Sequence, residues 1–312
     1  MKSVDSTFCG VPACDSSEID ASVAIFGAAE GTPYRRGQAS HAAGAPAAIR
    51  GALDWFSVGR EQYDFDVRST VMGMARVVDC GDVETDPNEG VANRTAIRGI
   101  TSRLLAKGVI PLLLGGDDST PIPVIDAFSA TGRPLTILQI DAHIDWRNEI
   151  DGERYGYSST MRRASEMSHV TRIIQAGARG PGSARLADYE DAVRWGAHIV
   201  PMREIFKKGL SGVLASVVPD SDIFLSIDVD GIDPSVVPGV ILPAFGGLTY
   251  QQVLELIEGV AAKARIVGGA FVEYVPNRDP SGFGAKAIAR LACCLVAHAG
   301  GRAPPCDDFS AN

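Results

Sequence analysis

Short apolar segments alternate with longer amphipathic segments along most of the chain. The apolar segments are rich in β-branched and aliphatic residues, as expected for strands, and cover residues 22–28, 109–116, 135–141, 171–177, 198–201, 222–230 and 265–274. Between them, segments 92–108 and 249–265 have apolar residues at helical spacing, with Gly108 as the expected stop of the first and Thr249 as the N-cap of the second. Because the strands are apolar on both faces and alternate with helices, the pattern predicts a parallel sheet covered on both sides.

The same pattern favours one α/β domain over residues 1–312, with polar tails at about 1–20 and 300–312. The chain has neither a linker-like stretch nor an internal repeat. The main alternative architecture is a TIM barrel, which needs eight regular βα units. The strand spacing is irregular and does not supply such units, so the sequence favours an open sheet.

The charge of the chain restricts the classes of partner. It has 29 Lys and Arg against 38 Asp and Glu, which gives a net charge of −9. This balance disfavours nucleic acid and suits neutral or cationic small molecules. No apolar run approaches the roughly 20 residues that span a bilayer, and the polar, acidic N-terminus has no signal-peptide core. We therefore expect a cytoplasmic protein that is neither secreted nor bound to a membrane.

The cysteine pattern is typical of a protein whose cysteines are free thiols. There are 6 of them, and no CxxC pair occurs. Cys293 and Cys294 lie in an apolar segment, where cysteine usually acts as a small core residue. We expect buried or inert thiols, rather than disulfides or a zinc site, at Cys9, Cys14, Cys80, Cys293, Cys294 and Cys306.

Acidic clusters follow two of the predicted strands directly. One strand runs into Asp141, His143 and Asp145, and another runs into Asp228 and Asp230. In an extended chain, side chains two residues apart share a face, so the members of each cluster are expected to converge. A third strand ends in a Gly-Gly-Asp-Asp segment, residues 115–118. Ligands of open parallel sheets bind outside the carboxyl ends of the strands, where these groups would meet.

Acids after strands can also cap helices or line a solvated rim. Two alternating clusters directly after buried strands favour a different interpretation, because carboxylates packed together repel and must take up protons. Cations remove that cost. Sites rich in oxygen with some imidazole suit Mn²⁺ or similar metals, and two ions could share bridging carboxylates.

The motifs around these clusters resemble those of the ureohydrolase family, which includes arginases, agmatinases and other guanidino-acid hydrolases. The resemblance covers about residues 27–295 and rests on GGDDS (115–119), DAHID (141–145), SIDVDGIDP (226–234), GGLTY (246–250) and VEYVP (272–276), in the family's order. It implies a three-layer α/β/α fold, usually assembled as trimers or hexamers. It also implies a binuclear Mn²⁺ centre, or Ni²⁺ in some relatives, that hydrolyses a guanidino C–N bond and releases urea.

The resemblance assigns roles to individual residues. The metal ligands would be Asp141, His143, Asp145, Asp228 and Asp230, and Glu273 would receive the cationic guanidinium of the substrate through paired N–H bonds. Three further acids match structural positions that hold loops, and two glycines match a tight turn: Asp117, Asp233, Asp279, Gly246 and Gly247.

Two positions depart from the family pattern. Asp118 stands where the family motif GGDHS has a metal-binding His, and Tyr157 stands where a segment like SHGT has a His assigned to proton transfer or substrate contact. The candidate metal ligands are therefore Asp118, Asp141, His143, Asp145, Asp228 and Asp230. The candidate catalytic residues are Glu273, Tyr157 and Asp145, which is also one of the ligands. The loop over residues 237–245 also differs at the expected pocket entrance, so the resemblance does not identify the substrate.

Both changes have chemical consequences. With Asp118 as a ligand, five carboxylates around two divalent ions give −5 + 4 = −1, where the family set gives −4 + 4 = 0. The extra charge raises the pKa of a bound water and weakens the metal as a Lewis acid. A tyrosine with an ordinary pKa of about 10 is a poor proton shuttle, and losing such help typically costs on the order of 10²–10⁴ in rate.

The sequence leaves three hypotheses open. The chain is a weakly active or inactive subunit paired with a metal-complete paralogue in a hydrolase of guanidino or biguanide compounds such as metformin. Alternatively, it is a self-sufficient agmatinase or guanidino-acid hydrolase with a modified site. A third possibility is another reaction on the same fold, such as formimino-group hydrolysis. Of the other histidines, His41 follows the first predicted strand and is the best candidate to replace the lost ligand.

Overall fold

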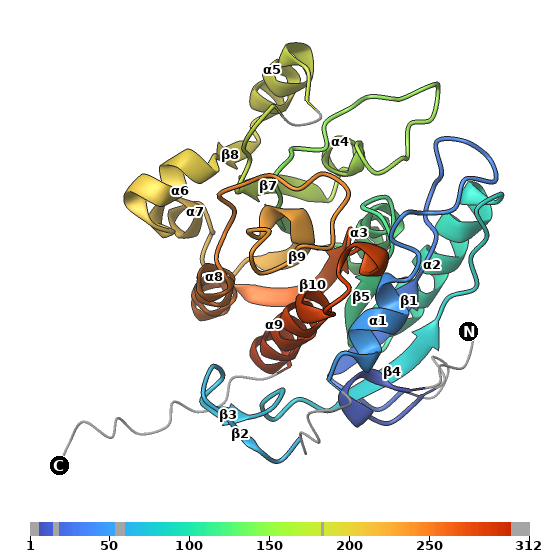
Figure 1. The fold of residues 1–312 in the computed structure, drawn as a ribbon, viewed down its shortest axis with the longest axis vertical. Coiled ribbons are helices and arrows are strands. Elements are labelled where there is room, and N and C mark those ends of the chain that lie inside the picture. Colours follow the sequence, from blue (N-terminus) through green and yellow to red (C-terminus); the bar gives the residue numbers. More distant parts are fainter. Residues whose placement is uncertain (1–5, 15–18, 54–59, 182–183, 301–312) are drawn as a thin grey trace.

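The computed structural model describes residues 6–14, 19–53, 60–181 and 184–300, and an eight-stranded sheet lies at its centre (Figure 1). The strand order is β4-β1-β5-β10-β9-β6-β7-β8, and every pair is parallel. The strands are β1 (Val23–Ala28), β4 (Val77–Asp82), β5 (Ile110–Gly115), β6 (Leu135–Ile140), β7 (Val170–Ala176), β8 (His198–Val200), β9 (Asp222–Asp228) and β10 (Arg265–Val272). The open, parallel sheet predicted from the sequence is confirmed.

Helices cover both faces of the sheet and make a three-layer structure (Figure 1). One apolar core joins the sheet to α1 (Ala45–Gly51), α6 (Met202–Lys208), α7 (Ser211–Ala215), α8 (Tyr250–Lys263) and α9 (Phe283–Ala299). The other joins it to α2 (Gly90–Ala106), α3 (Pro121–Ala127), α4 (Thr160–Ser165) and α5 (Leu186–Trp195). Successive strand residues such as Ile25 and Phe26 point into different cores, which is why these strands are apolar on both faces.

Short 3₁₀ turns complete the secondary structure at Phe8–Gly10, Phe128–Thr131, Val229–Gly231 and Pro276–Arg278. The expected cap of α8 is present, since the Thr249 hydroxyl accepts a hydrogen bond from the Gln252 N–H at 3.2 Å. Gly108 follows α2 with a φ of +70°, as expected for a helix stop. No described helix is long and apolar enough to cross a membrane.

The hydrophobic pattern does not reveal two parts of the fold. Strand β4 carries Asp79, Gly81 and Asp82 among its apolar residues, so its pattern is broken. The antiparallel pair β2 (Tyr63–Asp64) and β3 (Ser69–Thr70) is too short to give a periodic signal. Within the segment expected to be a polar tail, Phe8 is buried, and its N–H donates to Asp79 at 2.8 Å.

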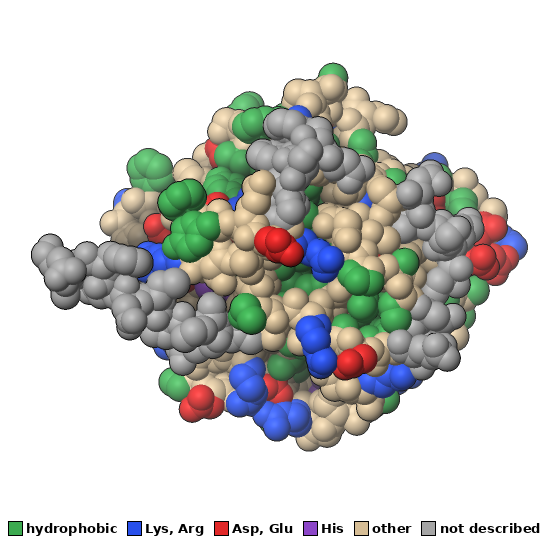
Figure 2. Space-filling model, turned by 90° about the horizontal axis from the view of Figure 1, so that it is seen from below, with side chains coloured by type: hydrophobic (Ala, Val, Ile, Leu, Met, Phe, Trp, Pro, Cys, Tyr) green, Lys and Arg blue, Asp and Glu red, His purple; other side chains and the backbone are tan. Residues whose placement is uncertain are grey.

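No disulfide joins the cysteines that the structure describes, and Cys80, Cys293 and Cys294 are buried. Cys306 lies outside the described residues. On the face shown in Figure 2, Lys and Arg side chains lie beside Asp and Glu side chains and among apolar ones, so charges of both signs are interspersed there.

A buried ion pair fixes β4 against α1. The Arg50 side chain is 1% exposed and donates to both carboxylate oxygens of Asp79, at 2.8 and 3.2 Å. We expect Arg50→Met to lower the free energy of unfolding by about 3–5 kcal/mol, because the Asp79 carboxylate would stay buried without its partner. Urea unfolding followed by circular dichroism measures this. Arg76→Gln, which removes an equal charge from an exposed pair with Asp20, should change stability by less than about 1 kcal/mol. Equal losses in both variants would contradict the prediction.

Candidate metal centre

The candidate residues meet because their strands are neighbours. Strands β5, β10, β9 and β6 lie side by side and run parallel, so their carboxyl ends share one edge of the sheet. Asp118 follows β5, Glu273 follows β10, Asp228 ends β9, and Asp141 follows β6. This is the edge at which ligands of parallel sheets bind.

Two groups of ligating atoms form there and share one residue. Asp141, His143 and Asp230 make the first, and Asp118, Asp141 and Asp145 make the second, with the atoms of each group within 4.8 Å of one another. Asp141 is therefore placed to bridge two cation positions. Asp228 stands beside the first group, where its carboxylate accepts a hydrogen bond from the Asp230 N–H at 2.9 Å.

The acidic motifs converge through turns rather than through an extended chain. The Asp141 carboxylate accepts the N–H of His143 at 2.6 Å, just as Asp228 accepts that of Asp230. Such side-chain bonds to the backbone two residues on are typical turns of aspartate. Asp145 then has a φ of +43°, which is uncommon for a residue other than glycine. The convergence predicted from alternation is present, but its geometric cause is different.

Gly231 allows the two loops to come together. A Cβ at this position would lie 2.5 Å from the Asp141 nitrogen, closer than any side chain tolerates. The approach also lets the Asp230 carboxylate accept the N–H of Ala142 at 3.1 Å. The glycine between the two aspartate motifs is thus required by packing.

The five aspartates are buried, with exposed fractions between 1% and 6%. Burial, together with the charges of neighbouring acids, raises the pKa of Asp118, Asp145, Asp228 and Asp230. Burial also acts to raise the pKa of Asp141, but hydrogen bonds from neighbours, His143 first, lower it overall. For His143, burial lowers the pKa, whereas Asp141 and Asp230 raise it to about 11. With all five carboxylates ionised, the cluster would therefore hold more negative charge than the protein groups neutralise.

Asp118 gives the clearest indication that this site fits a cation. Neither of its carboxylate oxygens has a hydrogen-bond donor among the described residues, although both are buried. A buried, ionised carboxylate without donors is strongly unfavourable unless it takes up a proton or a cation faces it. The residues present, five carboxylates and one imidazole, fit divalent ions such as Mn²⁺.

A chain of two buried amides supports the shared region, and sequence reasoning missed it. Gln139 Nε2 donates to Asp141 at 2.6 Å and to Asp145 at 2.7 Å. Gln175 Nε2 in turn donates to Gln139 Oε1 at 2.6 Å and to the Ile144 carbonyl at 2.8 Å. The available signal was Gln139 itself, a polar residue in an apolar strand on the same face as Asp141. Hydrogen bonds of this kind orient metal ligands.

Glu273 lies at the end of β10 with a φ of +69°. One of its carboxylate oxygens accepts the Asp118 N–H at 2.8 Å, and the other is in contact with Nε2 of His41. The hypothesis that His41 replaces the lost ligand does not match this arrangement. His41 reaches the proposed substrate acid instead and joins neither ligand group.

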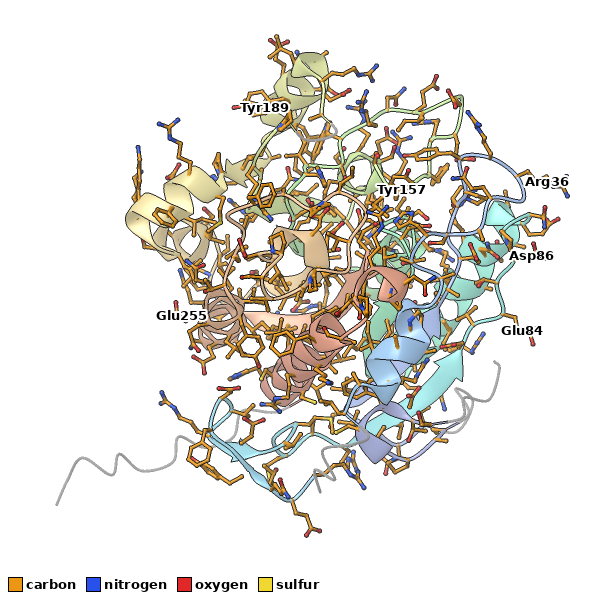
Figure 3. The ribbon with its side chains drawn as sticks, in the orientation of Figure 1. Arg36, Glu84, Asp86, Tyr157, Tyr189 and Glu255 are labelled. Atoms are coloured by element: carbon orange, nitrogen blue, oxygen red, sulfur yellow. The ribbon has the colours of Figure 1, made fainter. Side chains whose placement is uncertain are left out.

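Tyr157 packs among aromatic rings beside this pair. Its ring lies edge-on to Tyr34, with centroids 4.7 Å apart, and to His41, at 5.3 Å. Figure 3 shows Tyr157 in the interior of the loop region, whereas Arg36 and Asp86 lie at the periphery. Burial and the charges of Glu273 and Asp117 raise the pKa of Tyr157, so its hydroxyl keeps its proton near neutrality. Sequence reasoning does not single out Tyr34.

The structural acids hold loops through backbone hydrogen bonds, as expected. Asp117 accepts from Ser119 N–H, Asp233 from Ser235, Gly246 and Gly247, and Asp279 from Gly284. Gly246 has a φ of +73°, which confirms the predicted tight turn. These bonds fix the loops that carry the site.

Comparisons with known proteins agree with this arrangement. Residues 21–298 match the arginase family. The chain is 30% identical over 248 residues to guanidinobutyrase from Pseudomonas aeruginosa, covering 77% of each protein, and 30% identical to mitochondrial agmatinase from Gallus gallus, covering 77% of this chain and 72% of the relative. The structure of proclavaminate amidino hydrolase from Streptomyces clavuligerus superposes with a TM-score of 0.82 at 26% identity, covering 96% of this chain and 98% of the other.

The sequence match and the superposition cover the same sheet, helices and strand-end clusters described above. The α/β/α layers therefore have the arginase-like architecture expected from the motifs. The chain belongs to the arginase family.

Proposed function

We propose that this chain hydrolyses a C–N bond of a guanidino or biguanide compound, using divalent cations held by its own residues. The observation that carries the proposal is the pair of ligand groups that share Asp141, with Asp118 completing the second group. The names of the relatives, guanidinobutyrase and an amidino hydrolase among them, support this reaction class.

Asp141, His143, Asp230 and Asp228 would hold one cation, and Asp118, Asp141 and Asp145 the other. When bound, Mn²⁺ or Ni²⁺ would lower the pKa of water and polarise the substrate. In the overall reaction, the oxygen of water bonds to the guanidino carbon, the C–N bond to the amine breaks, and a proton moves to the departing nitrogen. The products are urea, or a urea-like compound, and an amine.

Glu273 would bind and orient the cationic group of the substrate. It is a buried carboxylate beside the ligand groups, and a planar cation can donate two N–H bonds to it. The rings of Tyr34, His41 and Tyr157 lie next to one another and offer aromatic surface to a cation. Tyr157 keeps its proton near neutrality, so it would not take part in proton transfer. The Nε2 atom of His41, beside Glu273, is the group there that could accept and release a proton.

A specific observation also favours the second candidate function, a partner subunit with little activity of its own. His41 occupies the carboxylate oxygen of Glu273 that a substrate would use, and Asp118 replaces an imidazole ligand. In that case the chain would act in a trimer or hexamer, with a metal-complete paralogue supplying activity. Both candidates give the chain a part in the hydrolysis of guanidino compounds.

Metal content and urea release of the full chain decide between them. After growth with Mn²⁺ and Ni²⁺, elemental analysis should find about two ions per chain, and guanidino compounds should release urea. Asp118→Asn keeps the shape but removes the charge, so it should lose about one of the two ions. Asp222→Asn is the control, because Asp222 is a buried acid at the opposite end of β9.

Metal-free chain that releases urea only with an added paralogue would overturn the self-sufficient site and establish the partner subunit. Two bound ions without urea from any guanidino or biguanide compound, alone or with a paralogue, would overturn the proposed reaction. A formimino substrate would be recognised by formamide or ammonia as the product in place of urea.

A further inference from the structure

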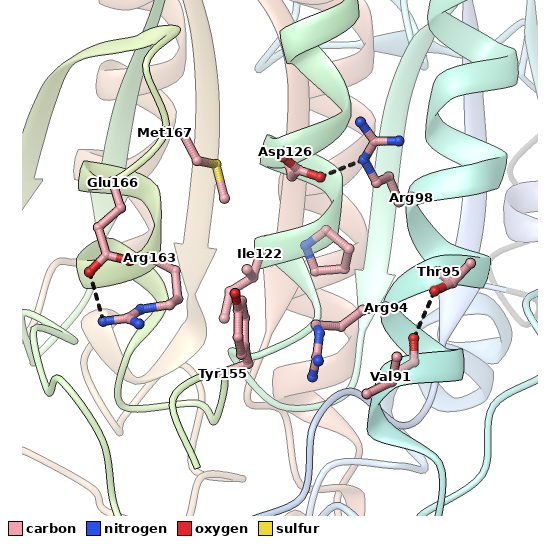
Figure 4. A pocket seen from close by; sticks show the side chains of 11 residues that line it. Val91, Arg94, Thr95, Arg98, Ile122, Asp126, Tyr155, Arg163, Glu166 and Met167 are labelled. Carbon is pink, nitrogen blue, oxygen red and sulfur yellow. Dashed lines mark hydrogen bonds and ion pairs between the residues drawn. The ribbon is translucent and has the colours of Figure 1, made fainter. Parts of the chain in front are cut away.

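A cavity lies outside the metal centre, between α2, α3 and α4 (Figure 4). Its volume is about 430 Å³, and its polar lining includes Arg94, Arg98, Arg163, Tyr155, Asp126 and Glu166. Neither Glu273 nor any candidate metal ligand lines it. The chain has a net charge of −9, so three arginines around one cavity concentrate positive charge in an otherwise acidic protein.

Two of these arginines face the same aromatic ring. The guanidinium carbon of Arg94 lies 4.2 Å from the centroid of the Tyr155 ring, and that of Arg163 lies 5.9 Å from it. Figure 4 shows Tyr155 between the two side chains. The ring stabilises both cations through its π face but neutralises neither of them.

The acids of the cavity are already engaged. Asp126 pairs with Arg98, and Glu166 is shared among Arg154, Arg162 and Arg163. Arg94 donates to the Thr32 hydroxyl at 2.8 Å, and no carboxylate pairs with it among the described residues. The cavity therefore keeps an excess of positive charge.

Arg163 places part of this positive charge in the protein interior. Its side chain is 2% exposed, and its Nε and Nη1 have no acceptor among the described residues. Burial, and the charges of Arg154 and Arg162, disfavour the protonated guanidinium and lower its pKa, against the opposing effect of Glu166. Its Nη2 pairs with Glu166 at 3.1 Å, but a buried cation whose other donors lack acceptors is costly, and an anion at this wall of the cavity would offset that cost.

We propose that this cavity binds a small oxyanion, a carboxylate or a phosphate group, on the wall that Arg94 and Arg163 form beside the Tyr155 ring. Guanidinium groups hold such anions through paired, charge-assisted N–H bonds, and the cavity has room for a small molecule that carries one. Anion binding here needs neither the metals nor the guanidino substrate. It can therefore be tested independently of the proposed reaction.

The bound anion would be connected to the metal centre through α4. At the start of this helix, the Thr160 hydroxyl donates to the carbonyl of Asp118, and the Arg162 N–H donates to the carbonyl of Asp145 at 3.1 Å. Arg163 belongs to the same helix. A shift of α4 toward an anion would therefore reach two candidate metal ligands.

Isothermal titration calorimetry with the full chain tests the site. Inorganic phosphate and succinate are titrated separately at an ionic strength held constant with NaCl. We expect saturable binding of at least one of them, and Arg94→Gln should weaken it about tenfold or more. Arg76→Gln, which removes an equal charge from an exposed pair with Asp20 outside the cavity, should leave it unchanged.

Binding of phosphate alone would identify a phosphorylated ligand, and binding of succinate would identify a carboxylate. Arg163 is buried in α4, so its replacement would disturb packing; Arg94→Gln therefore carries the test, and its folding is checked by circular dichroism. No binding of either anion, or equal affinity in Arg94→Gln, would overturn the proposal. A change in the oligomeric state of Arg94→Gln without anion binding would also overturn it and assign the cavity to an acidic segment of another chain.

Discussion

Asp141→Asn is expected to abolish metal binding and to lower urea release by more than about 100-fold, since changes one step further from a metal already cost about 10–100-fold. Asp141 is the one carboxylate in both ligand groups, and its loss removes a ligand from each cation position. Asparagine retains the shape but neither the charge nor the second oxygen acceptor. The remaining acids would still repel one another without a shared cation between them.

Elemental analysis and urea release measure this effect on the same preparation. Asp79→Asn is the control, because Asp79 is an equally buried aspartate in β4 that binds Arg50 rather than the site. The control should lose stability yet retain its metal. An Asp141→Asn variant that keeps two ions per chain would show that Asp141 does not bridge, and the two groups would then be separate sites or none.

The sequence predicts which edge of the sheet carries the candidate metal ligands, because the residues that follow each strand can be identified locally. Asp141 and Asp228 directly follow apolar strands, and parallel strands bring such ends together whatever the intervening chain does. The broken pattern of β4 shows the opposite case. Asp79 is buried there with partners from elsewhere in the sequence, the Arg50 guanidinium and the Phe8 N–H.

Contacts between distant loops could not be predicted in this way. His41 meets Glu273 across 232 positions, and Gln175 meets Gln139 across 36, through side chains whose directions depend on the finished packing. A sequence pattern places His41 at the same edge of the sheet as the metal-ligand candidates but does not show whether it contacts a metal or Glu273. That distinction needs three-dimensional geometry.

Glu273→Gln is expected to lower kcat/KM for a guanidino substrate roughly 100-fold, about 3 kcal/mol, through a higher KM. The variant keeps the shape of the side chain and can keep the bond from the Asp118 N–H. It loses the negative charge that a buried guanidinium needs as a partner. Asp279→Asn is the matched control, because that buried acid binds Tyr274 and the Gly284 N–H, away from the ligand groups.

The pH dependence of KM gives a second test, because His41 contacts Glu273 and would compete with a substrate cation bound there. Burial lowers the pKa of His41, but the hydrogen bond and charge of Glu273 raise it overall. The charged pair is therefore present at low pH and is lost as pH rises through the raised pKa, while the guanidinium stays protonated. KM should fall over that range in the native protein, and His41→Asn should remove the part of this fall that comes from the histidine; burial raises the pKa of Glu273, so loss of its own proton gives the remaining part. A KM that ignores pH in the native protein, or that Glu273→Gln leaves unchanged, would mean that the substrate cation binds elsewhere.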